Sequence, residues 1–306
     1  MDKNIKLKAY CDNIDRAEQK CISIEAQLIY SGLQTDTSVS KERKTYRFSH
    51  DVVINLDKIK GLGDFIEIEG AIEKETCRII ENLIKTFDIS FPEMIPWSYG
   101  EMVKMYENSH LYRIKLHKTK KTGTLFLLDG ASCSGKTTIL HDLGCEELIE
   151  ILPRYCTREP RKNIRTESEY VFVSKDKFRT LASSGAFIEY RDYLFGMSYG
   201  IPWKETFDYL LSGKNLLGII NLGNVLHVRK IFPEAVLILI DAPVRTIKKR
   251  LNERGFNKKE QIEERLENAG RVESCKKYYD CIINNDDDML KKSEEKIKKI
   301  IMKKSG

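Results

Sequence analysis

A glycine-rich segment of this 306-residue chain has the residue types that bind a polyphosphate. Residues 130–137 read Gly-Ala-Ser-Cys-Ser-Gly-Lys-Thr and fit the pattern G-x-x-x-x-G-K-[ST]. In this pattern, backbone N–H groups surround the phosphates, the lysine reaches the β- and γ-phosphates, and the threonine hydroxyl binds Mg²⁺. The segment therefore predicts a nucleoside triphosphate site, with Lys136 as a catalytic cation and Thr137 as the metal ligand. The predicted binding residues are Gly130, Ala131, Ser132, Cys133, Ser134, Gly135, Lys136, Thr137 and Thr138.

The elements that must position this loop lie directly beside it. Residues 125–128, Leu-Phe-Leu-Leu, predict a buried strand before the loop, and residues 138–140, Thr-Ile-Leu, begin a helix after it. The alternative is a glycine-rich turn with a chance lysine. The strand and the helix together favour the phosphate site, because that site needs both elements.

Composition limits the class of protein. With 41% hydrophobic residues the chain can form packed cores, in one large domain or two ordinary ones. Its longest apolar runs, such as residues 235–240, are too short to span a bilayer, and residues 1–4 open on charges instead of an apolar signal segment. Its eight cysteines form no C-x-x-C pair, which favours reduced thiols over disulfides or a zinc site. We therefore expect a cytoplasmic protein without a membrane partner.

The charge pattern gives little support for a nucleic-acid partner. The net charge of +6 is modest, and part of it lies in the closing segment, where no stacking-aromatic or recognition-helix motif accompanies it. Leu290, Ile297, Ile300 and Ile301 recur at helical spacing there, so we expect a helix with one packed face and one solvated face. The oligomeric state stays open.

The chain changes character near residues 117–123, His-Lys-Thr-Lys-Lys-Thr-Gly, which have no apolar face and predict a linker. We therefore expect domains at residues 1–116 and 124–306. In the first domain, residues 52–56 and 65–69 predict strands, and residues 71–87 predict an amphipathic helix.

The first domain contains motifs of a known family. Residues 53–69, Val-Ile-Asn-Leu-Asp-Lys-Ile-Lys-Gly-Leu-Gly-Asp-Phe-Ile-Glu-Ile-Glu, and residues 97–99, Trp-Ser-Tyr, resemble the CYTH domains, the family of class IV adenylate cyclases and thiamine triphosphatases. This resemblance implies a small α+β domain in which carboxylates hold a divalent metal and basic side chains neutralise a triphosphate. Lys41, Arg43, Glu67 and Glu69 are the residues that match such a site.

The departures from this family indicate a shortened, degenerate domain. The expected Glu-x-Glu-x-Lys motif is present only as Asn-Ile-Lys-Leu-Lys at residues 4–8, so its metal-binding carboxylates are missing. Several strands expected between residues 37 and 41 are also missing, so a closed tunnel is not expected. The resemblance thus implies shared ancestry more than activity. An alternative for Glu67 and Glu69 is the solvent-facing side of an alternating strand. Whether the first domain senses a nucleotide, mediates dimerisation or is a remnant stays open.

The second domain resembles the guanylate kinases from about Thr124 to the C-terminus. The matching segments follow in the family's order at residues 156–161, 169–174, 185–190, 198–202, 249–255, 264–266 and 279–286. The resemblance implies a three-layer α/β P-loop NTPase fold with a parallel sheet. It also implies ATP with Mg²⁺ as phosphoryl donor and a small phosphorylated acceptor.

Several residues have expected roles in that site. Two arginines three residues apart, Arg158 and Arg161, suit a bidentate phosphate clamp. The resemblance adds Tyr170, Tyr199 and Glu189 to the acceptor site, with core packing as the alternative for either tyrosine ring.

Positive charge near the transferred phosphoryl group is expected from Lys136 and three further residues. The resemblance makes Arg250, Arg254 and Arg265 lid arginines, and Asn285 an ATP-binding residue. Phosphoryl transfer depends mainly on positioning and electrostatics, so no general base is needed. The alternative for each arginine, considered alone, is a solvated charge on the surface of a helix.

The residues that depart from the guanylate kinase pattern belong to the acceptor site. Arg154 stands where guanylate kinases have a serine, Ile164 replaces an acidic residue, and residues 218–221 read Gly-Ile-Ile-Asn instead of Leu-Asp-Ile-Asp. Asn221 and the Ser-Tyr-Gly-Ile-Pro segment at residues 198–202 are also similar to ribose 1,5-bisphosphate kinases. We therefore expect a kinase acting on a nucleoside monophosphate. A ribose phosphate kinase is the first alternative, and an inactive nucleotide-binding module is an alternative of another class. A triphosphate hydrolase or cyclase in the first domain is opposed by its missing carboxylates.

Overall fold

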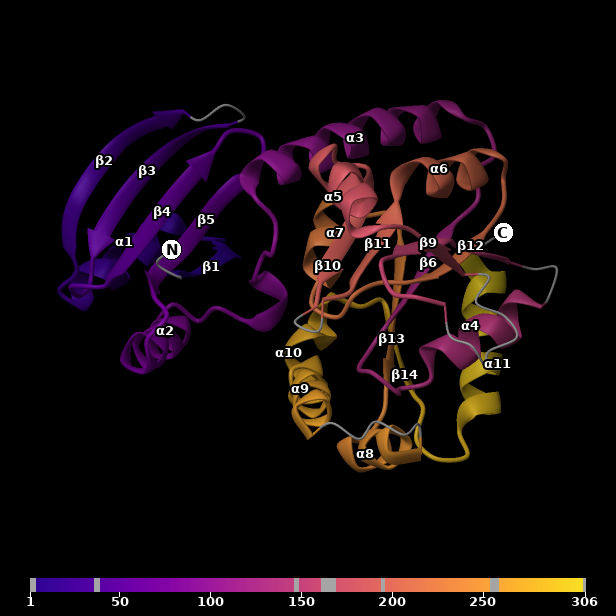
Figure 1. Ribbon diagram of the computed structural model, residues 1–306. Helices are drawn as coiled ribbons and strands as arrows, with labels where there is room; N and C mark the ends of the chain where they lie inside the picture. Colours follow the sequence, from indigo (N-terminus) through magenta and orange to yellow (C-terminus); the bar gives the residue numbers. More distant parts are fainter. Residues whose placement is uncertain are drawn as a thin grey trace. The chain divides into compact units, whose positions relative to one another are not determined.

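A computed structural model describes residues 4–35, 39–145, 149–160, 169–193, 196–253 and 259–304 (Figure 1). The chain divides into two compact units, Met1–Tyr106 and Glu107–Gly306. The division falls within helix α3 (Tyr99–Lys118), ahead of the linker predicted at residues 117–123, and the predicted domain bounds stay a prediction. Each unit is described by itself below.

Unit 1 is built on a five-stranded antiparallel sheet in the order β1-β5-β4-β3-β2, which agrees with the β-rich first domain expected from the sequence. Its strands are β1 (Asn4–Tyr10), β2 (Gln27–Thr35), β3 (Ser40–Arg47), β4 (Val52–Ile59) and β5 (Gly63–Ala71). Its helical elements within the unit are α1 (Ile14–Ser23), α2 (Lys74–Thr86) and the 3₁₀ turn η1 (Phe91–Glu93). The strands predicted at residues 52–56 and 65–69 and the helix predicted at 71–87 are thereby confirmed, with longer strands and a shorter helix.

The two faces of this sheet differ because strand side chains alternate. Ile54 on β4 and Ile68 on β5 belong to the core that also contains residues of α1 and α2. Asn55 follows Ile54 on β4, and Glu67 precedes Ile68 on β5. These two neighbours are directly paired in the register and lie on the opposite face. Polar side chains of several strands therefore gather on one face of the sheet.

The outermost strand of this sheet, β2, is chemically unusual. It reads Gln-Leu-Ile-Tyr-Ser-Gly-Leu-Gln-Thr, without a charged residue, and Leu28 and Leu33 are 50% and 68% exposed. At the other end of the strand order, β1 carries Lys6 and Lys8, and the N–H of Ile95 donates to the carbonyl of Lys8 at 2.7 Å.

Unit 2 contains a five-stranded sheet with all its pairs parallel, in the order β14-β13-β6-β12-β7. Its strands are β6 (Leu125–Asp129), β7 (Glu150–Ile151), β12 (Leu216–Ile219), β13 (Val236–Asp241) and β14 (Cys281–Asn284). Alternate residues of β13 point to two different cores: Ile238 packs with residues of α4 and α11, and Leu239 with residues of α8. Helices therefore cover both faces, which confirms the predicted three-layer α/β fold.

The helices α4 (Lys136–Gly144) and α11 (Leu290–Lys304) lie side by side (Figure 1). Ile297 and Ile301 of α11 are fully buried in the core that α4 shares, so the predicted packing of the closing helix is confirmed. The other helical elements of unit 2 are α5 (Lys175–Ser183), α6 (Trp203–Leu211), α7 (Val225–Ile231), α8 (Val244–Glu253), α9 (Lys259–Gly270), α10 (Val272–Cys275) and η2 (Lys276–Tyr278).

A second, four-stranded sheet of unit 2 has the order β10-β11-β8-β9. Its strands are β8 (Arg154–Cys156), β9 (Tyr170–Phe172), β10 (Phe187–Asp192) and β11 (Ser198–Pro202). Three of the residues predicted to bind the acceptor, Tyr170, Glu189 and Tyr199, lie on this sheet, and Arg158 follows β8 by two residues. All eight cysteines are free thiols, in agreement with the sequence prediction. Among the described helices, none combines the length and the apolar character that crossing a membrane requires.

Candidate active site

The loop between β6 and α4 has the backbone shape that its glycines permit. Gly130 and Gly135 have φ values of 140° and 106°, which residues other than glycine rarely adopt. A Cβ atom on Gly130 would lie 2.3 Å from the carbonyl oxygen of Ile240, and one on Gly135 would lie 2.2 Å from Nδ2 of Asn285. Both positions therefore require glycine, and the predicted strand, loop and helix are confirmed.

The loop curls around the side chain of Lys136. The Nζ atom of Lys136 donates hydrogen bonds to the carbonyl oxygens of Gly130 and Ala131, both at 2.7 Å, and lies 3.4 Å from Oγ of Ser134. The positive charge is thus held against the inner side of the loop. Thr137 follows in the first turn of α4. Within the described part of the chain, its hydroxyl makes no hydrogen bond, so the oxygen is available to a hard cation such as Mg²⁺.

Three residues predicted from the sequence contact this loop from distant parts of the chain. Nδ2 of Asn285 donates to the carbonyl of Ser134 at 2.8 Å, and Nη1 of Arg250 donates to the carbonyl of Cys133 at 3.3 Å. Nη1 of Arg265 donates to Oγ of Ser132 at 2.6 Å. The predicted Arg254 lies outside the described residues.

A cavity of ≈ 260 Å³ lies beside the loop. Its lining comes from the loop, α4, α8, the residue after β14 and the start of α11, namely Cys133, Gly135, Thr138, Arg250, Glu253, Asn285 and Leu290. Four of the residues predicted for ATP binding therefore share one cavity with a predicted lid arginine. This concentration of donors at a helix N-terminus suits an anionic ligand.

A buried carboxyl group at the start of the loop was not predicted. Asp129, the last residue of β6, is fully buried, and its Oδ1 and Oδ2 accept hydrogen bonds from the Gly130 N–H at 2.6 Å and from the Tyr279 hydroxyl at 2.5 Å. Burial raises the pKa of Asp129, while these two hydrogen bonds and the charge of Lys136 act in the opposite direction. The sequence signal for this buried carboxyl group was its position, directly between a buried strand and the phosphate loop.

On the second sheet, Glu189 is the centre of a buried polar network. Its side chain is fully buried, and its Oε2 accepts hydrogen bonds from Nδ2 of Asn221 at 2.8 Å and Nδ2 of Asn224 at 2.6 Å. The oxygen Oδ1 of Asn221 accepts from Nη2 of Arg154 and, at 3.0 Å, from the Tyr193 hydroxyl. Asn221 therefore connects a carboxylate to a guanidinium. Burial raises the pKa of Glu189, and the charge of Arg154 opposes that rise.

The remaining acceptor candidates lie next to this network. The guanidinium of Arg154 is 4.9 Å from the ring centre of Tyr199, and that of Arg158 is 4.6 Å from the ring centre of Tyr170. The two tyrosine rings are 6.1 Å apart. Arg161 lies outside the described residues, so the structure places one arginine of the predicted clamp. The network also brings in Arg154, Tyr193 and Asn224, which the sequence did not assign to the site.

The residues singled out in unit 1 also lie together. The guanidinium of Arg43 donates to both carboxylate oxygens of Asp57, at 2.6 and 2.5 Å, and to Oε1 of Glu67 at 2.7 Å. Glu67 is 1% exposed, so the alternative of a solvent-facing row is wrong for this residue. Lys41 is 3.5 Å from Asp57.

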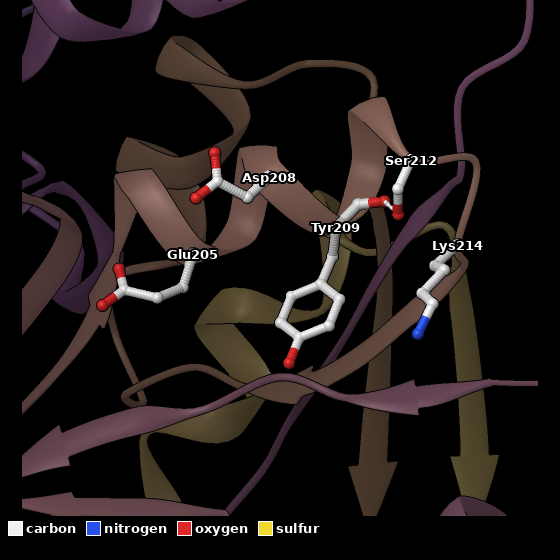
Figure 2. A pocket seen from close by; sticks show the side chains of 5 residues that line it. All are labelled: Glu205, Asp208, Tyr209, Ser212 and Lys214. Atoms are coloured by element: carbon white, nitrogen blue, oxygen red, sulfur yellow. Dashed lines mark hydrogen bonds between the residues drawn. The ribbon is translucent and has the colours of Figure 1, made fainter.

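A second cavity, of ≈ 390 Å³, lies at helix α6 (Figure 2). It is lined by Glu205, Asp208, Tyr209, Ser212 and Lys214. Its charged groups are already used: Glu205 accepts from the Tyr155 hydroxyl at 2.7 Å, and Lys214 pairs with Glu150 at 2.7 Å. No residue of loop 130–135 lines it, and we assign no function to it.

Comparisons with known proteins identify relatives of this chain. The protein-family model named Guanylate kinase matches residues 122–304. A guanylate kinase from Clostridium acetobutylicum is 31% identical over 166 residues, which cover 54% of this chain and 79% of that protein. A crystal structure of guanylate kinase from Anaplasma phagocytophilum has a TM-score of 0.48 and 24% identity, and covers 61% of this chain and 88% of that one. A structure from Vibrio parahaemolyticus described as a candidate adenylate cyclase covers 32% of this chain and 95% of that one, with 16% identity and a TM-score of 0.28.

Proposed function

Because this chain belongs to the guanylate kinase family and is a guanylate kinase-like phosphotransferase, we propose that it transfers the γ-phosphoryl group of ATP to a small phosphorylated acceptor. A nucleoside monophosphate is the first candidate acceptor. The observation that carries this proposal is the loop 130–135, which holds Lys136 on its inner side and receives Asn285, Arg250 and Arg265 from three other segments. Such an arrangement concentrates donors where a triphosphate develops negative charge.

The residues have distinct proposed tasks. Backbone N–H groups of the loop and Lys136 bind the phosphates of ATP, and Thr137 supplies a hydroxyl ligand for Mg²⁺, which neutralises phosphate charge when it is bound. Arg250 and Arg265, with Arg254, neutralise the charge that develops during transfer. An oxygen of the acceptor phosphate attacks the γ-phosphorus, the bond between that phosphorus and the β,γ-bridging oxygen breaks, and ADP leaves.

The acceptor is proposed to lie over the second sheet. Arg158, Arg161, Tyr170 and Tyr199 would hold its phosphate, and Glu189 would support the rest of the acceptor site through Asn221 and Asn224. The relatives' name, guanylate kinase, makes GMP the first acceptor to test.

A second acceptor class is favoured by one observation. Asn221 stands where the guanylate kinase pattern has an aspartate, and its Nδ2 donates to both carboxylate oxygens of Glu189, at 3.0 and 2.8 Å. With that aspartate absent and Glu189 held by Asn221, an acceptor without a base, such as a ribose phosphate, becomes the second candidate.

The test measures ADP formation from Mg-ATP with a panel of nucleoside monophosphates and ribose phosphates. Lys136→Ala serves as the blank, and Lys204→Ala, which changes an exposed lysine of α6, serves as the matched control. Turnover with GMP supports the first candidate, and turnover only with a ribose phosphate supports the second. If no acceptor raises ADP formation above the Lys136→Ala blank, the kinase proposal is wrong and a nucleotide-binding module remains.

A further inference from the structure

The polar face of the sheet in unit 1 allows a test of whether a divalent metal ion fits there, as the CYTH resemblance implies. A bound Mg²⁺ or Mn²⁺ needs oxygen ligands that are not already neutralised. Three carboxylates, those of Asp57, Glu67 and Glu69, lie in this region. Yet among the described residues no group of three or more His, Cys, Asp or Glu side chains is arranged to hold a metal ion.

The reason is that one lysine lies between two of these carboxylates. Nζ of Lys6 is 3.2 Å from Oε1 of Glu67 and 3.0 Å from Oε1 of Glu69. The backbone places it there, because Lys6 is paired with Glu69 in the register of β1 and β5. Glu67 and Glu69 are alternate residues of β5, so both side chains point to the same face. The ammonium group therefore bridges the two carboxylates as a metal ion would.

Within the described part of unit 1, the other groups on this face neutralise the remaining carboxylates. Asp57 is fully buried and is neutralised by Arg43, with Lys41 3.5 Å away, and it also accepts from the Tyr99 hydroxyl at 2.9 Å. Glu67 accepts from Arg43 as well as pairing with Lys6, and Glu69 accepts from Nδ2 of Asn55 at 3.0 Å. The three carboxylates thus face Lys6, Lys41 and Arg43, and a fourth cation, Lys8, is paired with Glu67 in the register and lies 3.8 Å from the ring centre of Tyr99. An added divalent ion would bring uncompensated positive charge to this face, which is costly where groups are buried.

We propose that the Lys6 ammonium group takes the place of a divalent metal ion between Glu67 and Glu69, so that the ionic face of unit 1 is complete without metal. This inference is independent of the proposed kinase function, since its residues all belong to unit 1. It makes a definite statement about one side chain. Removing the ammonium should create a metal site that the natural chain does not have.

The experiment measures Mn²⁺ binding by the full chain without nucleotide, from the electron paramagnetic resonance signal of free Mn²⁺. Lys6→Glu places a third carboxylate beside Glu67 and Glu69 and removes the bridging cation. We expect this variant to bind one more equivalent of Mn²⁺ than the wild type. Lys60→Glu makes the same charge change at an exposed position after β4 and should bind no more than the wild type. Any Mn²⁺ bound at loop 130–135 contributes equally to all three proteins.

Two further variants complete the test. Glu67→Gln should leave the Mn²⁺ stoichiometry of the wild type unchanged; a lost equivalent would overturn the proposal, because it would mean that Glu67 binds metal despite Lys6. Lys6→Met keeps both glutamates and removes the charge, so it too should bind one more equivalent of Mn²⁺ than the wild type. This variant decides the matter if Lys6→Glu fails to fold by circular dichroism. If neither Lys6 variant binds more Mn²⁺ than Lys60→Glu, the proposal is wrong.

Discussion

The hydroxyl of Tyr279 donates a 2.5 Å hydrogen bond to Oδ2 of Asp129, across 150 positions of the chain. This contact ties the segment before β14 to the residue at which β6 ends and loop 130–135 begins. Asp129 is fully buried, so each donor to its carboxylate matters. The start of the loop is therefore positioned by a side chain from the far end of the sequence.

We expect Tyr279→Phe to destabilise the protein by about 1–3 kcal/mol, because it leaves a buried carboxylate oxygen without its donor. The measurement is the free energy of unfolding in urea. Tyr209→Phe is the matched control, since the Tyr209 hydroxyl makes no hydrogen bond within the described part of the chain. Equal losses in the two variants would show that the Tyr279 hydroxyl has no special role.

We expect Gly135→Ala to weaken nucleotide binding and to destabilise the protein by about 1–3 kcal/mol. The new methyl group would lie 2.2 Å from Nδ2 of Asn285, at a φ of 106° that alanine rarely adopts, and would break the bond from Asn285 to Ser134. Gly270→Ala is the control, because nothing lies within 4 Å of a Cβ atom there. Calorimetric titration with ATP and thermal unfolding would measure both effects. Tight ATP binding by Gly135→Ala would contradict the proposed role of the loop.

We expect Arg265→Met to lower kcat about 100-fold, with a smaller change in the KM for ATP. The reason is that Arg265 reaches Ser132 of the loop, where its charge can act on the transferred phosphoryl group. Arg271→Met removes a neighbouring arginine that pairs with Glu267 instead, and should keep kcat within about twofold. The measurement is the steady-state rate of ADP formation with the best acceptor. An unchanged kcat in Arg265→Met would remove this residue from the catalytic set.

We expect the free energy of unfolding to fall between neutral pH and pH 5 because of His227. Burial lowers the pKa of this histidine from 6.5 to about 3, so it stays neutral in the folded protein while the unfolded chain takes up a proton below pH 6.5. Stability is therefore lost as the pH falls from about 6.5 toward 3, by about 1.4 kcal/mol per pH unit at most.

The test of this pH dependence compares urea unfolding at pH 7.5 and pH 5 for the wild type and His227→Gln. The glutamine keeps an N–H donor for the Ile188 carbonyl, which lies 3.2 Å from Nε2 of His227, but it does not titrate. The wild type should lose about 2 kcal/mol more than the variant between the two pH values. Parallel losses would assign the acid sensitivity to other groups.

The sequence predicted the features that depend on local order. The loop 130–137 and its flanking strand and helix are consecutive, so their pattern could be recognised along the chain. The packed face of α11 was likewise visible as helical periodicity, and residues 52–69 showed the alternation of paired strands.

The networks that were not predicted join residues far apart in the chain. Arg154 and Asn221 are 67 positions apart, and the order of the strands, which no local pattern encodes, brings them together. In the sequence, Arg154 stood out as a replacement for serine and Asn221 as a replacement for an aspartate. Nothing in the sequence indicated that the two side chains form a hydrogen bond. In the sequence, Lys6 marked only the loss of a metal-binding glutamate. The structure shows that it neutralises the carboxylates of Glu67 and Glu69.

The uncharged outer strand β2 has a consequence for the behaviour of the protein in concentrated solution. A strand at the end of a sheet offers unpaired backbone groups, and charged side chains are the common protection against pairing with foreign strands. β2 has none, and it exposes Leu28 and Leu33 beside that edge. Self-association is therefore expected to involve this edge and to increase with protein concentration.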